Sequence, residues 1–207
     1  MIQNPLLALA CAALVGYLLG GVDFAAIVAR SRGVDIYEVG SGNPGTSNVL
    51  RTLGKGPAAM VLLGDLQKGL VSAGFGFILA DADASGPFAS MSVASLAGLA
   101  AVVGHCYPAL HQFKGGKGVA TAFGLIAFVE PLVGLSLGVV WGVVVVLTRT
   151  ASLGSLLVVV LTLPAMLLLG ADVWSLAWVA LALVVIVFRH KDNIERILHR
   201  SEQAVTE

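Results

Sequence analysis

The chain has 207 residues, of which 57% are hydrophobic and 12% are charged, and its mean hydropathy is +0.93. An ordinary soluble domain carries about twice this share of charged residues, so the composition excludes that class of protein. The 12 basic and 12 acidic residues cancel. Net charge therefore gives no sign of a nucleic-acid partner, and we expect none.

Apolar runs of roughly twenty residues, the length that crosses ~30 Å of hydrocarbon, recur along the chain. Examples are Leu6–Val22, Phe88–Val103 and Ser152–Leu169. The pattern predicts membrane-spanning helices at about 6–29, 57–80, 88–111, 119–129, 131–147, 152–169 and 173–188. The first run is longer than the apolar part of a signal peptide, so we expect a retained helix.

The connections between these runs alternate in charge. One set holds nearly every Lys and Arg, whereas the other set (81–87, 130–131 and 170–172) has no basic residue. Basic loops are retained in the cytoplasm. A break at Pro131, which removes a helix hydrogen bond, gives seven spans and returns every basic cluster to one side. One continuous helix over 119–147 would give six spans and would place the basic clusters on different sides of the membrane.

The sequence therefore predicts an all-α transmembrane bundle of about seven spans. Its N-terminus is expected outside and its C-terminus in the cytoplasm. No linker, low-complexity tract or clear internal repeat is visible, so residues 1–207 are expected to form one domain.

The first polar segment on the basic side runs from Gly40 to Asn48 as Gly-Ser-Gly-Asn-Pro-Gly-Thr-Ser-Asn, with Arg51 one turn later. Its glycines allow backbone N–H groups to form a concave nest, and the hydroxyl and amide side chains add donors. Such a nest at a helix start suits phosphate. Without a preceding strand, its glycine spacing is not a dinucleotide fingerprint. The alternative is a flexible polar loop.

The second segment is Phe113-Lys-Gly-Gly-Lys-Gly-Val-Ala-Thr121, which combines two lysines with three glycines. It places cations beside an accessible backbone, as a phosphate site requires. It is not a Walker A loop, because Gly118 stands where that motif needs Ser or Thr. Lysines that only anchor topology are the alternative, but that explanation leaves the glycines unexplained.

The third segment, Arg189–Leu198, is a short amphipathic stretch after the last apolar run. A membrane-surface helix with snorkelling cations is a serious alternative to a binding role. Asp65 and Lys68 lie three residues apart inside the second span, where ionisable side chains either face a cavity or pair with each other. His105 ends the third span and is as consistent with a structural role as with a catalytic one. Asp23, in the first span, has no obvious partner.

Together these segments resemble one family, the bacterial acyl-phosphate:glycerol-3-phosphate acyltransferases. The shared motifs occur in the family's order and cover nearly the whole chain. They are Val39–Asn48 with Arg51, Asp65-Leu-Gln-Lys-Gly69, His105-Cys-Tyr-Pro108, Phe113–Thr121, Ser152-Leu-Gly-Ser155 and Arg189–Arg196.

The resemblance implies a seven-helix protein of the bacterial cell membrane whose active site faces the cytoplasm. Its substrates would be acyl phosphate and glycerol 3-phosphate, and its product lysophosphatidic acid acylated at the 1-hydroxyl. No cofactor, coenzyme A or metal would be needed. The oligomeric state is not indicated.

By their positions in these motifs, the residues that the resemblance implies to be functional are Ser41, Asn48, Arg51, Lys68, Lys114, Lys117, Asn193 and Arg196. With the nest residues and His105, the predicted catalytic set is Ser41, Arg51, Lys114, Lys117 and His105. The predicted substrate- and phosphate-binding set is Gly40, Gly42, Asn43, Gly45, Thr46, Ser47, Asn48, Lys68, Gly115, Gly116, Gly118, Asn193 and Arg196.

Two positions depart from the family pattern. Arg200 stands where a Gly usually precedes the tail Glu, which puts Glu202 in doubt, and Asp23 stands where the family typically has Pro.

The expected chemistry needs little from the protein, because an acyl phosphate is already an activated mixed anhydride. The site has to align the hydroxyl and stabilise the developing oxyanion. The soluble and coenzyme-A-linked acyltransferases have a His followed five residues later by an Asp, and none of the four histidines here has an Asp at that distance. The base is therefore either His105 or a substrate phosphate oxygen, and we favour the phosphate. The main rival is a transporter of a phosphorylated solute, although the polar loops gather at one face rather than at mid-membrane. A scaffold protein is a distant third.

Overall fold

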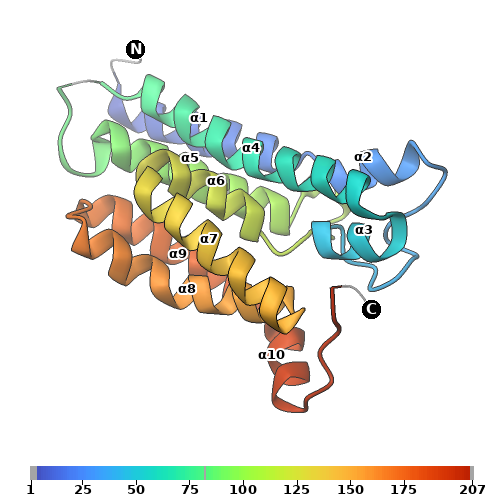
Figure 1. Ribbon diagram of the computed structural model, residues 1–207. Coiled ribbons are helices and arrows are strands. Elements are labelled where there is room, and N and C mark those ends of the chain that lie inside the picture. Colours follow the sequence, from blue (N-terminus) through green and yellow to red (C-terminus); the bar gives the residue numbers. More distant parts are fainter. Residues whose placement is uncertain (1–3, 82, 206–207) are drawn as a thin grey trace.

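The computed structural model describes residues 4–81 and 83–205, and the regular structure in that part of the chain is entirely helical (Figure 1). The α-helices are α1 Pro5–Gly20, α2 Phe24–Arg30, α3 Thr46–Leu53, α4 Lys55–Leu79, α5 Ser90–Cys106, α6 Val119–Val129, α7 Pro131–Thr148, α8 Ala151–Leu168, α9 Val173–Arg189 and α10 Lys191–Leu198. Two short 3-10 turns cover Gly86–Phe88 and Ala109–His111. The prediction of an all-α fold is confirmed.

Five helical segments within the described residues are long and apolar enough to cross a membrane: Pro5–Arg30, Lys55–Leu79, Ser90–His111, Pro131–Thr148 and Ala151–Leu168. A sixth forms if α9 and α10, which meet at an angle of 57°, count as one broken span. The remaining apolar helix, α6, has 11 residues and rises about 16 Å, roughly half the hydrocarbon thickness.

The first predicted span is not one continuous helix. The structure breaks it between Gly20 and Phe24, and α2 begins after Asp23. The Asp23 carboxylate accepts a hydrogen bond from Ala26 N at 2.9 Å, which caps α2, and a second one from the Tyr37 hydroxyl. An unpaired carboxylate would be costly at this depth, so these two donors explain how an acidic residue is tolerated here.

Glycine allows the helices to approach backbone to backbone. A Cβ added to Gly16 or Gly20 of α1 would lie 2.2 or 2.1 Å from a carbonyl oxygen of α5. Gly69 and Gly124 bring α4 against α6 in the same way, because an added Cβ would lie 1.9 or 2.0 Å from a carbonyl oxygen of the facing helix. Small residues at such crossings are typical of packing inside membranes. The larger apolar core is formed mainly by α5, α6, α8 and α9, which contribute Val102, Leu125, Val158, Val179 and Ile186.

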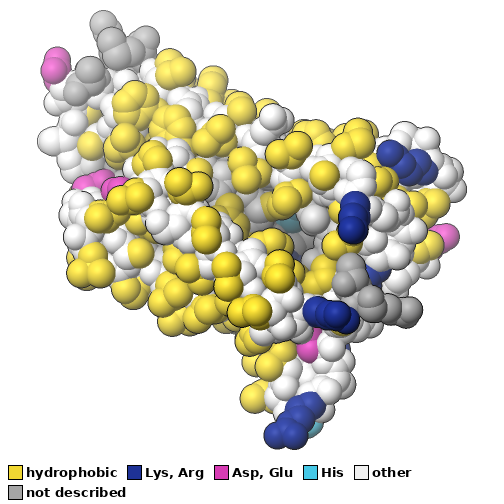
Figure 2. Space-filling view, viewed as in Figure 1, with side chains coloured by type: hydrophobic (Ala, Val, Ile, Leu, Met, Phe, Trp, Pro, Cys, Tyr) yellow, Lys and Arg dark blue, Asp and Glu magenta, His cyan; other side chains and the backbone are white. Residues whose placement is uncertain are grey.

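The outer surface separates by chemistry. Large apolar side chains such as Leu14, Ile78, Leu135 and Leu168 are exposed along the helices. Lys and Arg gather in Figure 2 at the end of the molecule that carries α2, α3 and α10. At this end α10 projects from the bundle, and the chain beyond it turns back toward α3 (Figure 1). The basic end is where the predicted polar segments meet.

Candidate active site

A cavity of about 160 Å³ lies at the basic end of the bundle. Most of its wall comes from the segment before α3, from α3 itself, from the start of α6 and from α10 with the following tail, and α4, α5, α7 and α8 contribute the rest. The predicted site residues that line it are Ser41, Asn43, Gly45, Thr46, Ser47, Asn48, Arg51, His105, Lys117, Gly118, Asn193 and Arg196. The lining runs from Ser41 to Val205, so segments far apart in the sequence contribute to one site.

The first glycine segment is held in shape by Asn48, a buried residue in the first turn of α3. Its Oδ1 accepts from Ser41 N at 2.9 Å, and its Nδ2 donates to Val39 O at 3.0 Å. Gly40 has φ of +59° and leaves no room for a Cβ, which would lie 2.2 Å from Asn48 Oδ1. Asn48 thus shapes the loop, and its amide is not free to bind a ligand as predicted.

Helix α3 begins beside the cavity without a side-chain cap, since its N-cap residue is Gly45. Helix N-termini leave backbone N–H groups unpaired and carry partial positive charge, which favours anions. Thr46 and Ser47, the first two residues of the helix, line the cavity with their hydroxyls nearby. The predicted phosphate nest falls on this end of α3, and its binding of phosphate stays a prediction.

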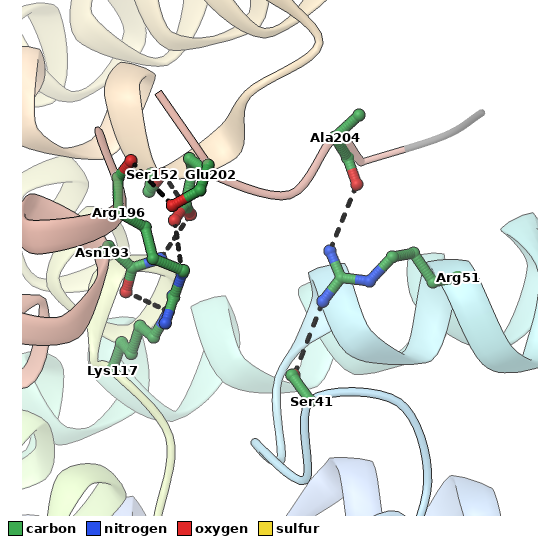
Figure 3. A network of polar contacts seen from close by, with 9 residues as sticks. Ser41, Arg51, Lys117, Ser152, Asn193, Arg196, Glu202 and Ala204 are labelled. Atoms are coloured by element: carbon green, nitrogen blue, oxygen red, sulfur yellow. Dashed lines mark hydrogen bonds and ion pairs between the residues drawn. The ribbon is translucent and has the colours of Figure 1, made fainter. Parts of the chain in front are cut away.

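Arg51 lies one turn into α3 and faces the same space (Figure 3). Its guanidinium is 3.5 Å from Ser41 Oγ and 3.4 Å from the carbonyl oxygen of Ala204 in the tail. Both distances are long for charge-assisted hydrogen bonds. Burial lowers the pKa of Arg51, and the Glu202 carboxylate acts in the opposite direction. Its weak internal partners leave Arg51 available to an anionic ligand.

A tighter network occupies the opposite wall (Figure 3). Lys117 Nζ donates to Asn193 Oδ1 at 2.5 Å, and Asn193 Nδ2 donates to Glu202 Oε1 at 2.5 Å. Ser152 Oγ and Arg196 Nε donate to the same carboxylate, each at 2.7 Å. Burial lowers the pKa of Lys117 to about 8, and Glu202 opposes that shift. Lys117 is therefore a cation that would gain from a further anionic partner.

Glu202 lies at the centre of this network, although Arg200 in place of the usual Gly had put its part in the site in doubt. Burial alone would raise the pKa of Glu202, but hydrogen bonds from Ser152, Asn193 and Arg196 outweigh it and lower the pKa. Arg200, two residues before Glu202, has φ of +55°, a conformation that glycine adopts more easily. The chain thus makes with an arginine a turn that suits glycine, and Glu202 reaches the network.

His190 was not predicted, although it is buried and lines the cavity. Its Nδ1 is 2.8 Å from Ile186 O, and burial lowers its pKa to about 4, so the ring is neutral. The signal was its spacing: His190 precedes Asn193 by three residues, which places both on one face of a helix.

The second glycine segment is arranged differently from the prediction. Lys114 is exposed and does not line the cavity, and its carbonyl oxygen accepts from the Tyr37 hydroxyl at 3.2 Å. Arg189 turns inward instead and donates to Gly116 O at 3.0 Å and Gly115 O at 2.6 Å. Added Cβ atoms at either glycine would lie 2.1 Å from His105. These glycines therefore serve close packing against protein rather than contact with the cavity.

Lys68 is also placed away from the cavity. Its ammonium lies 2.9 Å from Asp65 Oδ1 and donates to Val22 O at 3.0 Å, and the residue is 6% exposed. Because both contacts are to protein, the predicted phosphate role of Lys68 does not fit its position. Asp65 itself lines the cavity together with His105. Across residues 4–81 and 83–205, no group of three His, Cys, Asp or Glu side chains is arranged to hold a metal ion.

Comparisons with known proteins give a consistent result. A family model described as glycerol-3-phosphate acyltransferase matches residues 10–200. A glycerol-3-phosphate acyltransferase from Rubrobacter xylanophilus is 40% identical over 190 residues, which cover 92% of each chain. One from Thioalkalivibrio sulfidiphilus is 43% identical over 199 residues, covering 95% of this chain and 94% of the relative.

Solved structures agree with these relatives. The crystal structure of PlsY (YgiH), an integral membrane glycerol 3-phosphate acyltransferase, in its glycerol 3-phosphate form is similar with a TM-score of 0.86 and 35% identity. Its lysophosphatidic acid form gives a TM-score of 0.85 and 34% identity. Each comparison covers 95% of this chain and 94% of the other.

Proposed function

Because this chain belongs to the glycerol-3-phosphate acyltransferase family, we propose that the cavity at its basic end binds glycerol 3-phosphate and takes the acyl group from acyl phosphate. The product is lysophosphatidic acid acylated at the 1-hydroxyl, with inorganic phosphate as the leaving group. The transporter alternative finds no support among relatives that are acyltransferases.

One observation carries this proposal: Arg51, Lys117 and Arg196 come from three separate segments and line one cavity. Both proposed substrates carry phosphate, so a shared site has to balance several negative charges. Glu202 offsets one of the three cations through its contact with Arg196. The uncapped start of α3 adds backbone donors beside Arg51. The surplus of positive charge matches a ligand that is anionic.

The proposed reaction follows from this placement. The 1-hydroxyl oxygen attacks the acyl carbonyl carbon, and the bond from that carbon to the phosphate oxygen breaks with its electron pair leaving on phosphate. The hydroxyl proton passes to a phosphate oxygen. Cations on two walls hold the reactants together and stabilise the developing negative charge, so positioning and electrostatics supply the catalysis.

A phosphate oxygen suits the role of base better than His105. His105 Nε2 lies against Gly116, where an added Cβ would be 2.1 Å from that nitrogen. A substrate hydroxyl has little room to approach it. The phosphates are brought by the substrates themselves and need no further group from the protein.

The main cavity has an apolar side. Val119 and Phe123, which line it, also line a crevice of about 10 Å³ between α6, α8 and α9. Its other walls include Ile126, Val158 and Leu183. Because the crevice has room for little more than one water molecule, an acyl chain would have to part these side chains to enter it. We propose only that the hydrocarbon of the donor leaves the cavity on this apolar side.

The proposal includes the orientation in the membrane. The chain would act as a single domain over residues 1–207 in the bacterial cell membrane, with seven spans, an outside N-terminus and its cavity facing the cytoplasm. The gathering of Lys and Arg at the cavity end supports this orientation, because basic segments stay cytoplasmic. In that arrangement α6 would have to cross despite its length.

In the deciding experiment, the purified protein is incubated with labelled glycerol 3-phosphate and a chelator, together with either acyl phosphate or acyl-coenzyme A. Labelled lysophosphatidic acid should form from acyl phosphate alone. Equal turnover with acyl-coenzyme A, or complete loss of activity on chelation, would contradict the proposed donor and the metal-free chemistry.

A further inference from the structure

A buried group of three ionisable side chains has no part in the reaction described above. Asp65 and Lys68 on α4 are 3% and 6% exposed, and His105 at the end of α5 is 8% exposed. Asp65 Oδ1 is 2.9 Å from Lys68 Nζ and 3.5 Å from His105 Nδ1. Mutual pairing of Asp65 and Lys68 explains how two charges are tolerated at this depth. It does not explain why the carboxylate also faces a histidine.

His105 connects this group to both glycine segments. Its carbonyl oxygen accepts from Gly116 N at 3.0 Å, and its ring packs against the same residue. A Cβ on Gly116 would lie 2.1 Å from His105 Nε2 and 2.8 Å from Pro44 O. Gly116 is therefore enclosed between the histidine and the first glycine segment, so a rotation of the His105 ring would disturb both.

Asp65 is the group that can fix the ring. Within the described residues, the buried His105 Nδ1 makes no hydrogen bond, and the Asp65 carboxylate faces it at 3.5 Å. A carboxylate facing Nδ1 holds the proton on that nitrogen and sets the ring plane. This places His105 Nε2 toward Gly116.

Lys68 has a separate effect, which is electrostatic. Asp65 lines the cavity in which anionic substrates would bind, and a bare carboxylate there would repel them. Lys68 supplies the opposite charge from the same helix. The other polar contact of the Lys68 ammonium, to Val22 O, joins the pair to the break between α1 and α2.

We propose that Asp65 is a positioning residue for glycerol 3-phosphate binding: it orients His105, which holds the two glycine segments in register, while Lys68 cancels its charge toward the substrate. The inference rests on the proposed site for glycerol 3-phosphate but not on the identity of the acyl donor.

Two double variants test it. Asp65→Asn/Lys68→Met and Asp65→Leu/Lys68→Met both replace the ion pair by neutral side chains of similar size, a change that buried pairs often tolerate. Only the Asn variant keeps an oxygen that can accept from His105 Nδ1. We expect similar thermal midpoints in detergent for both. The Asn variant should keep the KM for glycerol 3-phosphate within about threefold, and the Leu variant should raise it about tenfold, because it removes the polar acceptor that faces the ring.

The KM is the informative quantity, because a variant that is only less stable loses active enzyme and therefore kcat, with an unchanged KM. Ser72→Ala is the matched control: its buried hydroxyl donates to Lys68 O one turn along α4, and its loss should leave the KM unchanged. Equal KM values in the two double variants would overturn the inference.

The single variant Lys68→Met tests the charge effect. It should raise the KM above that of Asp65→Asn/Lys68→Met, because it leaves the carboxylate uncompensated. Calorimetric binding of glycerol 3-phosphate without a donor separates this inference from the proposed donor. A wild-type protein that binds glycerol 3-phosphate but does not use acyl phosphate contradicts only the donor. Identical dissociation constants in the Asn and Leu double variants contradict only the role of Asp65.

Discussion

The substitution Gly116→Ala adds one methyl group at a position that the structure leaves no room for. The new Cβ would lie 2.1 Å from His105 Nε2 and 2.8 Å from Pro44 O. Real Cβ atoms do not approach that closely, so either the His105 ring or the first glycine segment has to move. Pro44 O is backbone, and the His105 ring is buried beside Asp65, so neither yields easily.

The magnitude follows from the cost of overpacking, typically about 1–3 kcal/mol. If that cost falls on the arrangement that binds substrate, kcat/KM should drop about fivefold to 150-fold. The assay is the formation of labelled lysophosphatidic acid, with the thermal midpoint in detergent measured in parallel. Gly138→Ala in α7 is the matched control, because no atom of another part of the described chain lies within 4 Å of a Cβ there. It should leave activity unchanged and stabilise the helix slightly.

A near-normal kcat/KM for Gly116→Ala would refute the reasoning, since it would mean that the contact with His105 is loose. A loss of similar size in Gly138→Ala would also refute it, because the effect would then come from any added methyl group.

Three further predictions use the charged groups and the topology. Burial lowers the pKa of Lys117 to about 8, so the side chain loses its proton as pH rises through that value, and the KM for glycerol 3-phosphate should rise. Lys117→Arg stays charged and should flatten the dependence of KM on pH. A flat dependence in the wild type would contradict the role of Lys117. The folded pKa of Glu202 lies below its ordinary 4.5, so its stabilisation is present above that value and is lost on acidification below it. Glu202→Gln should therefore lower the thermal midpoint at neutral pH, by an amount that shrinks in acid, and a constant difference would argue against this. Single cysteines at the exposed residues Ser85 and Ser201, in a cysteine-free background, should label from opposite sides of intact cells, and labelling from one side would contradict seven spans.

The helices were predictable from the sequence because the bilayer fixes their length and the apolar runs record it. The break at Asp23 was not, since the flanking residues are apolar on both sides and one of the two donors to the carboxylate, the Tyr37 hydroxyl, comes from a later loop. Hydropathy carries no information about a donor that is distant in sequence.

The place of the first glycine segment beside the cavity follows from local chemistry, because the glycines, Asn48 and the start of α3 lie within nine residues. Its binding of phosphate stays a prediction. The outward position of Lys114 in the second segment was not predictable in this way. Gln112 and Phe113 both have positive φ, which turns the chain before Lys114 and directs that side chain outward. Non-glycine residues rarely adopt this conformation, so the pattern gave no warning.

The cavity's other wall depends on contacts that only the folded chain makes. Lys117 reaches Asn193 across 76 positions of sequence, and Glu202 reaches Ser152 across 50. The motifs indicated that Lys117 and Asn193 belong to one site. They could not show that Glu202 accepts a hydrogen bond from Asn193, or decide that Lys68 pairs with Asp65 rather than facing the cavity.

The spacing of Asp65 and Lys68 also bears on how the chain enters the membrane. Helix α4 has the lowest mean hydropathy of the five clear spans, 1.2, and each charge at the centre of an inserting helix costs about 2.5–3.5 kcal/mol. Because the two residues are three apart on one helix, they can neutralise each other as soon as that turn forms, before any neighbour has arrived. The segment can thus leave the translocon as a neutral unit. His105, synthesised later on α5, then meets a carboxylate already held in place, so the polar centre of the enzyme is assembled in the order in which it is translated.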